Sequence, residues 1–95
     1  MNRTSVHLIQ KSPFGCDALD ACIRVCADSD SIVLMNDAVY AAALPRIWPT
    51  KNVYALTDDM ASRGITVALA AGILSIDYKE LVELCSQHPH SQSWF

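Results

Sequence analysis

Short apolar runs alternate with helix-like segments four times in 95 residues, and this alternation most limits how the chain can fold. The apolar runs lie at residues 6–9, 31–35, 53–56 and 73–76. The second run, Ser31-Ile32-Val33-Leu34-Met35, is almost continuously apolar, as strands of parallel sheets are when both faces are covered. Repeated strand–helix units place a parallel sheet between helices. The alternation therefore predicts an α/β fold.

The segments after the first two runs carry helical signals. Apolar residues recur at the i, i+3, i+4, i+7 spacing of one buried helix face: Leu19, Cys22, Ile23 and Cys26. The start of this helix stays open, because Ser12 before Pro13 and Asp17 are both suitable N-caps. Asn36-Asp37 opens a short second helix, which the proline-containing loop at 45–50 stops.

Capping residues delimit the two later helices. Thr57 is expected to be the N-cap of the third helix, and Gly64 is expected to end it in the left-handed conformation. Asp77-x-x-Glu80 resembles a capping box at the start of the last helix, with Asp in place of Ser or Thr. Residues 65–71 are apolar without a clear period and receive no assignment, and residues 91–95 are interpreted as a tail.

Composition excludes several functional classes. The chain is 52% apolar but only 18% charged, which leaves more apolar surface than a single 95-residue domain can bury, so we expect a subunit interface. A net charge of −3 without a basic stripe argues against direct binding of nucleic acid. No apolar stretch approaches the ~18 residues of a membrane span, so we expect a cytoplasmic protein with no membrane contact.

The polar residues form none of the usual metal or cofactor motifs. In the expected cytoplasmic location the four cysteines should be reduced thiols. Because they contain no C-x-x-C pair, no zinc site is predicted, and no other cofactor is predicted either. Neither a P-loop nor the glycine-rich or serine motifs of dehydrogenases and hydrolases occur. Capping accounts for the acidic residues at the expected helix starts, which are Asp37, Asp58, Asp59 and Asp77.

Five segments, in order along the chain, resemble the TusB/DsrH family. Residues 7–14 are similar to the family opening, a strand followed by a basic residue and Ser-Pro-aromatic. Residues 37–42 resemble the family segment D-G-V-x-A-A but have Ala38 where the family has glycine, and residues 53–64 match V-Y-A-L-x-x-D-x-x-x-R-G. Two short segments complete the resemblance: Ile76-Asp77-Tyr78 and Gln92-Ser93-Trp94.

The resemblance implies a single DsrE-like domain over residues 1–95, a three-layer α/β/α sandwich with a small, mostly parallel sheet of four or five strands. It also implies a heterohexamer with TusC-like and TusD-like subunits that passes persulfide sulfur between carrier proteins. In the Tus branch this sulfur serves 2-thiolation of the tRNA wobble uridine, and in the Dsr branch it serves oxidation of stored sulfur. The main transferring cysteine belongs to the TusD-like subunit, so this chain is expected to be a non-catalytic or accessory subunit of a sulfurtransferase complex.

Two cysteines are candidates for a direct role in sulfur transfer, which requires an accessible thiolate. Cys22 aligns with a cysteine of DsrH-type members, yet its place on the apolar stripe also fits a packing residue. Cys16 lies near the expected helix start, where the helix dipole stabilises a thiolate, although an incidental loop cysteine is the alternative. Cys26 and Cys85 are expected to pack on apolar helix faces.

The histidines are interpreted structurally. His7 is expected to be a hydrogen-bonded core residue, and His88 and His90 flank Pro89 at an expected exposed helix end. The leading hypothesis is a structural sulfur-relay subunit, and the alternative is a cysteine-based persulfide carrier in its own right. A third hypothesis, from another class, is a module that binds a small ligand at the carboxyl ends of the strands.

Overall fold

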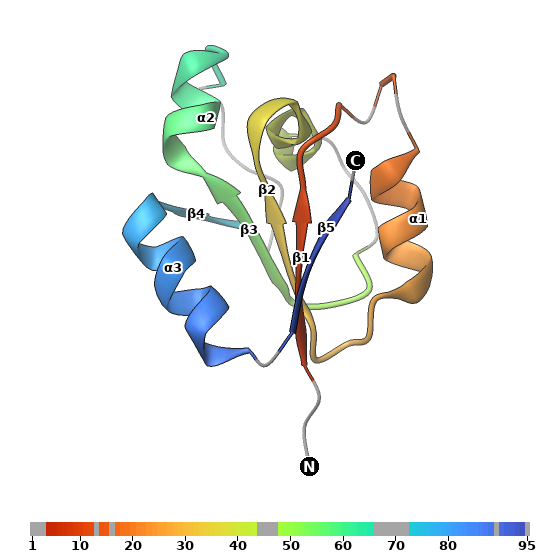
Figure 1. The fold of residues 1–95 in the computed structure, drawn as a ribbon. Coiled ribbons are helices and arrows are strands. Elements are labelled where there is room, and N and C mark those ends of the chain that lie inside the picture. The colour runs from red at the N-terminus through yellow and green to blue at the C-terminus, as the bar shows by residue number, and fades with distance from the viewer. Residues whose placement is uncertain are drawn as a thin grey trace.

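The computed structural model describes residues 4–12, 14–15, 17–43, 48–65, 73–88 and 90–94. Five strands form its sheet: β1 (Ser5–Ile9), β2 (Ser31–Leu34), β3 (Asn52–Leu56), β4 (Ile73–Ile76) and β5 (His90–Trp94). Four helical segments accompany the strands: α1 (Ala18–Val25), the 3₁₀ helix η1 (Asn36–Ala43), α2 (Thr57–Ser62) and α3 (Tyr78–Gln87). Helices α1 and α3 lie on opposite sides of the sheet, so the molecule has three layers (Figure 1). The predicted α/β fold is confirmed.

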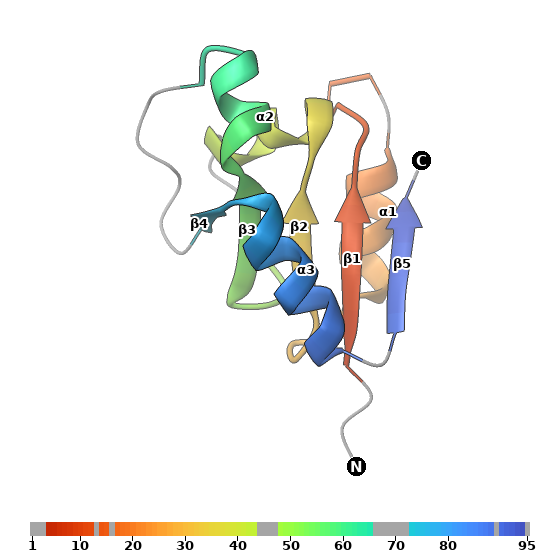
Figure 2. The same ribbon diagram turned by 60° about the vertical axis from the view of Figure 1, so that its left-hand side comes forward.

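The strands pair in the order β4-β3-β2-β1-β5, and every pairing is parallel. From β1 to β4 the chain moves in one direction across the sheet, and it then returns past β1 to place β5 at the opposite edge (Figure 2). Because parallel crossovers are right-handed, successive crossovers in one direction put their helices on one face, and the returning crossover puts its helix on the other. Strand order thus explains why α3 is separated from the other helices.

The face covered by α1, here called the α1 face, is the more completely packed of the two. Its cluster of buried side chains draws on α1, η1, α2 and the strands, and the members buried most fully among the larger residues are Ile9, Leu19, Ile32, Leu34, Val39 and Cys22. Met60 of α2 also joins this cluster. Three successive helical segments therefore seal this side of the sheet.

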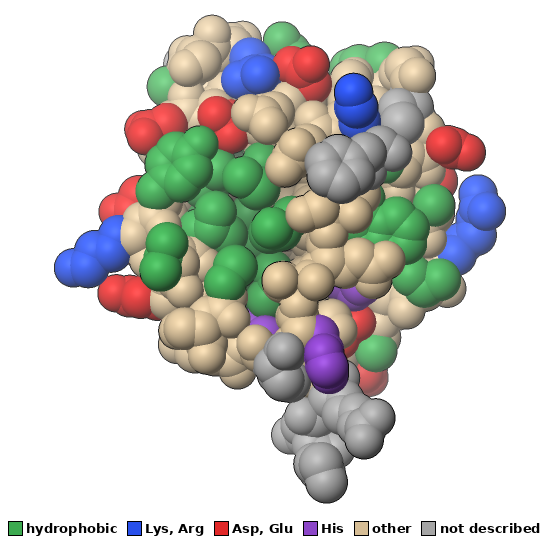
Figure 3. All heavy atoms as spheres, in the orientation of Figure 1, with side chains coloured by type: hydrophobic (Ala, Val, Ile, Leu, Met, Phe, Trp, Pro, Cys, Tyr) green, Lys and Arg blue, Asp and Glu red, His purple; other side chains and the backbone are tan. Residues whose placement is uncertain are grey.

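The opposite face, here called the α3 face, is covered among the described residues by one helix of ten residues. Its buried cluster is smaller and consists of Val6, Val33, Leu56, Ile76 and Leu81. Leu74, Tyr78 and Val82 are 62%, 50% and 67% exposed. Figure 3 shows hydrophobic side chains gathered over α3 and the adjoining part of the sheet. A substantial apolar area on this side is therefore open to solvent.

Strand β5 is the element that the sequence did not reveal. Its residues His90 to Ser93 are all exposed and include no apolar side chain, so they carry no strand pattern. The strand forms because β1 offers an unpaired edge, with Ser5 opposite His90 and Ile9 opposite Trp94. Pairing with a distant strand, rather than the local preference of its residues, therefore determines the extended conformation of this segment.

The predicted helix boundaries are mostly confirmed. Asp77 and Glu80 form a reciprocal capping box, and Gly64 has the expected positive φ of 68°. Thr57 as an N-cap is wrong, because Leu56 occupies that position and the Thr57 hydroxyl instead donates a hydrogen bond to the Ile76 carbonyl at 3.2 Å. Helix α1 starts after Asp17, whose side chain makes no capping bond.

Some sequence expectations lie outside the described residues: those on Pro13, Cys16 and Pro45, and nearly all of those on the unassigned stretch 65–71. In the parts of the chain that are described, no helix combines the length and hydrophobicity needed to cross a bilayer.

Candidate functional site

In open parallel sheets, ligands and chemistry gather at the carboxyl ends of the strands. Here the segments after β2 and β3 place Asp37, Asp59 and Arg63 together. Arg63 Nε donates to Asp37 Oδ1 at 2.9 Å, and its Nη1 donates to the Asp59 carbonyl at 3.2 Å. The Asp59 carboxylate accepts from the Asn36 backbone N–H at 2.7 Å.

The charged side chains of this cluster bond to groups within the cluster, and these bonds join η1 to α2. Asn36 has φ of 49°, a left-handed conformation that asparagine tolerates, and its backbone N–H donates to the Asp59 carboxylate. The hydrogen bond with Asp37 raises the pKa of the Arg63 guanidinium, so it stays charged. Asp37, Asp59 and Arg63 belong to the segments that resemble the TusB/DsrH family, and in the structure they clamp η1 to α2.

Cys22 lies on the buried side of α1 and has no exposed surface. Burial, followed by the nearby Cys26 and Asp30, raises the pKa of its thiol to about 12. At neutral pH the side chain is therefore a protonated thiol inside an apolar cluster. Geometry and electrostatics both match the packing interpretation of this residue.

The other described cysteines are partly buried. Cys26 follows the end of α1, and burial together with the Asp30 carboxylate raises the pKa of its thiol to about 11. Cys85 of α3 packs against the buried cluster of the α3 face. Cys16, the second predicted transfer residue, lies outside the described residues.

A buried polar network forms around His7 at the α1 face. His7 and Asp30 are 3% and 6% exposed, and His7 Nε2 lies 2.9 Å from Asp30 Oδ2. The Trp94 indole N–H donates to His7 Nδ1 at 3.1 Å, so Nδ1 is an acceptor and Nε2 carries the proton and donates a hydrogen bond to the Asp30 carboxylate. The expected role of His7 as a hydrogen-bonded core residue is confirmed.

Asp30 was missed as the centre of this network, because in the sequence it appears only as a helix breaker before β2. Its carboxylate also accepts the backbone N–H groups of Ser5 and Ala27, at 3.0 and 3.1 Å. Burial alone would raise the pKa of Asp30, but the hydrogen bonds from His7, Ser5 and Ala27 outweigh it and hold that pKa below its usual value. An aspartate next to an almost continuously apolar strand was the available signal, since buried carboxylates require partners.

The same place contains the one grouping of potential metal ligands found among the described residues. Donor atoms of His7, Cys26 and Asp30 all lie within 4.8 Å of one another. A metal on His7 Nε2 would move the ring proton to Nδ1, which would then face the Trp94 N–H donor. The hydrogen-bonding pattern fits a closed structural network and does not fit a metal centre.

His88 differs from the sequence expectation of an exposed helix end. It is half-buried at the end of α3, where Nδ1 lies 2.7 Å from the Thr4 hydroxyl and Nε2 lies 3.4 Å from that of Ser31. It therefore ties the end of α3 to the starts of β1 and β2. His90, on β5, is exposed as expected.

Comparison with known proteins identifies a matching family and similar relatives. Residues 11–91 match the family model described as "DsrH like protein". Protein TusB of Escherichia coli K12 is 33% identical over 96 residues, covering 94% of this chain and 99% of that protein, and Protein TusB of Pectobacterium parmentieri is 32% identical with the same coverage.

Two solved structures share the fold. The crystal structure of the YchN protein of Escherichia coli superposes with a TM-score of 0.78 at 19% identity, covering 97% of this chain and 99% of that one. The solution structure of Tm0979 from Thermotoga maritima superposes with a TM-score of 0.69 at 26% identity, covering 87% and 92%.

The fold and the sites together define a small α/β protein with an all-parallel sheet, a satisfied polar network and, among the described cysteines whose pKa is shifted, thiols held in the protonated form. Within that class, the extent of the family match and the TusB similarity identify the chain as a member of the TusB/DsrH family.

Proposed function

We propose that this protein is a structural subunit of a sulfur-relay complex that passes persulfide sulfur toward 2-thiolation of the tRNA wobble uridine. The similarity to Protein TusB supports this pathway over sulfur oxidation. The observation that carries the structural role is the state of Cys22, which is fully buried with a pKa of about 12. In this proposal the reactive cysteine belongs to a partner subunit.

The chemistry of sulfur transfer supports this division of labour. A carrier cysteine attacks as a thiolate and must meet the sulfur of another protein. A thiol with a pKa of about 12 is ionised in roughly one molecule in 10⁵ at pH 7. Cys26, with a pKa of about 11, is ionised in only about one molecule in 10⁴ at pH 7, and the carboxylate beside it repels a thiolate. Neither residue meets the needs of an efficient carrier.

The α3 face supports association with TusC-like and TusD-like subunits. Leu74, Tyr78 and Val82 are each at least half exposed there, although they are large apolar side chains. Exposed apolar area of this kind marks association surfaces in small proteins. We propose that sister subunits cover it in a heterohexamer.

Co-purification tests the proposal. The chain is expressed alone and together with the TusC-like and TusD-like subunits of its source organism, and masses are measured by light scattering. We expect a defined complex that contains all three chains. A chain that stays monomeric in the presence of both partners would contradict the proposal.

Mass spectrometry separates a structural subunit from a persulfide carrier. The assembled complex is incubated with a persulfurated donor, and each cysteine is checked for the addition of one sulfur atom. We expect Cys22→Ser and Cys16→Ser variants that still assemble to keep full transfer activity. Loss of transfer in an assembled Cys22→Ser or Cys16→Ser complex would establish the carrier function instead.

A further inference from the structure

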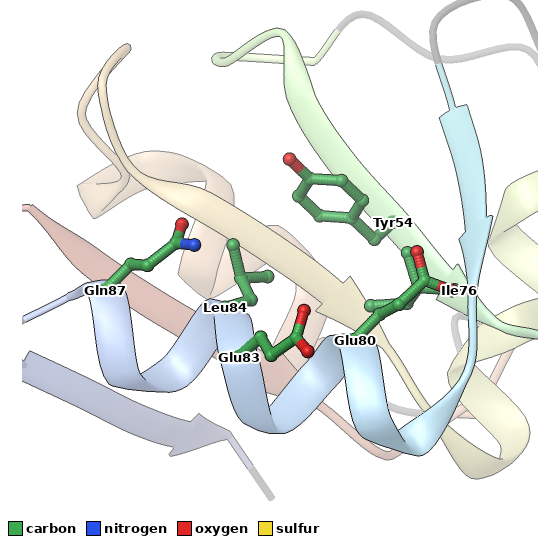
Figure 4. Close-up of a pocket in the computed structure, with 6 residues that line it drawn as sticks. All are labelled: Tyr54, Ile76, Glu80, Glu83, Leu84 and Gln87. Atoms are coloured by element: carbon green, nitrogen blue, oxygen red, sulfur yellow. The ribbon is translucent and has the colours of Figure 1, made fainter.

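A groove runs along one flank of α3, between the helix and strands β3 and β4. Tyr54 and Ile76 line it from the strands, and Glu80, Glu83, Leu84 and Gln87 line it from the helix (Figure 4). Its volume is about 160 Å³. Leu74, which is paired with Tyr54 across β3 and β4, extends the apolar surface to the sheet edge.

The groove combines an apolar base with an acidic rim. Ile76 and Leu84 form the base, and Figure 4 shows the carboxylates of Glu80 and Glu83 on the same side of α3 as the Tyr54 ring. One oxygen of Glu80 accepts the Asp77 backbone N–H at 3.2 Å as part of the capping box. Within the described ranges, no hydrogen bond or ion pair engages the Glu83 carboxylate or the Tyr54 hydroxyl.

We infer that this groove receives one long basic side chain, an arginine or a lysine, from a sister subunit of the complex; the inference rests on the function proposed above. The aliphatic stem of such a residue packs on Ile76 and Leu84. Its cationic head stacks on the Tyr54 ring and pairs with Glu83. An arginine satisfies both needs because its planar guanidinium stacks and forms two parallel hydrogen bonds to a carboxylate.

Size and charge favour this occupant over others. Sites for small molecules typically measure about 300–1,000 Å³, so a groove of about 160 Å³ fits one side chain better than a metabolite. The chain has a net charge of −3, and the two carboxylates that line the groove, Glu80 and Glu83, are both acidic. A basic residue on the partner therefore complements the whole surface as well as the groove.

The test measures affinity for the purified TusC-like and TusD-like subunits at low salt. Glu83→Gln removes one negative charge at the rim, and Tyr54→Leu removes the stacking surface. The matched control is Asp17→Asn, which removes one exposed charge beside α1 on the other side of the sheet, where the side chain makes no capping bond. We expect Glu83→Gln to weaken binding about tenfold or more, Tyr54→Leu about fivefold, and Asp17→Asn less than about twofold.

Charge exchange identifies the occupant. Glu83→Lys is combined in turn with Arg→Glu and Lys→Glu variants of the partner subunits, and one such pair is expected to regain most of the lost affinity. Equal binding by wild type, Glu83→Gln and Tyr54→Leu would overturn the groove inference while leaving the complex intact. If neither wild type nor Asp17→Asn binds the partner subunits, the proposed function and this inference are both overturned. If the chain self-associates and Glu83→Gln abolishes this self-association, the occupant of the groove is a second copy of the chain and not a sister subunit.

Discussion

The two faces of the sheet share the same strands but are covered very differently. On the α1 face, α1, η1 and Met60 of α2 enclose a broad cluster in which Leu34 and Ile32 have no exposed surface. On the α3 face, in the part of the chain that the structure describes, the ten-residue helix α3 covers a smaller cluster, and Leu74 and Val82 are more than 60% exposed. The first face accounts for most of the packing within the fold, and the second leaves apolar area exposed to solvent.

The difference shows that strand order can separate two roles on one small domain: one side of the sheet stabilises the fold, and the opposite side is open for association. Three crossovers run in one direction and place their helical segments on one face, whereas among the described residues the returning crossover places only α3 on the other. Substitutions on the α1 face should therefore change the free energy of unfolding, whereas exposed positions on the α3 face should change assembly. Four substitutions test this division.

Leu34→Ala should have the largest effect on stability. The side chain is fully buried in the α1-face cluster, and its truncation leaves a cavity where several elements meet. We expect a loss of about 2–5 kcal/mol in the free energy of unfolding, measured by urea denaturation. A loss below about 1 kcal/mol would mean that the α1 face is not the principal core.

Asp30→Asn should follow, because an amide cannot accept all three hydrogen bonds that reach the carboxylate. We expect a loss on the order of 2–3 kcal/mol at pH 7. The variant should leave the α3 face unchanged, so assembly by the remaining folded protein serves as its control.

The same residue predicts a pH dependence. The pKa of Asp30 is lower in the folded protein than its ordinary value of about 3.9, so its stabilisation is complete above that value and is lost as pH falls through the folded pKa. Wild type should lose more stability between pH 5 and pH 3 than Asp30→Asn does, in denaturation curves at each pH. Parallel curves for the two proteins would rule out this role of Asp30.

Trp94→Phe should have a smaller effect, which is localised at the sheet edge. It keeps most of the apolar contact but removes the 3.1 Å hydrogen bond to His7, leaving Nδ1 without a donor. We expect a loss of about 1 kcal/mol. Amide hydrogen exchange should accelerate more in β5 than in β2. An equal increase in exchange rate in all strands would show that the Trp94–His7 bond does not act locally on β5.

Leu74→Ser should have the smallest effect on the isolated chain. The side chain is 62% exposed on an edge strand, so the free energy of unfolding should change by less than about 0.5 kcal/mol. The same change should weaken assembly with the sister subunits in light scattering. An unaltered complex together with a destabilised monomer would reverse the assignment of the two faces.

Much of the fold could be predicted because local signals agreed with the final structure. The four apolar runs correspond to β1–β4, and the Asp77–Glu80 pattern formed the expected capping box. The helical spacing that includes Cys22 also predicted the burial of that residue. These features depend on neighbours a few residues away, which a sequence displays directly.

The features that could not be predicted depend on contacts between distant segments. Strand β5 exists because β1 has a free edge, and residues 90–93 contain no apolar pattern that would indicate it. Likewise, the network of His7, Asp30 and Trp94 joins residues separated by as many as 87 positions. The groove beside α3 also depends on how the helix lies against β3 and β4, which periodicity does not specify.

Pairing between the first and last strands also affects how the molecule forms. The outer edge of β1 has no neighbour in the sheet until β5, which lies far away in the sequence, pairs with it. Contacts of such high sequence separation form slowly, and an unpaired edge is open to pairing with other chains in the meantime. Detachment of β5 thus exposes a strand edge at which two chains can pair with each other.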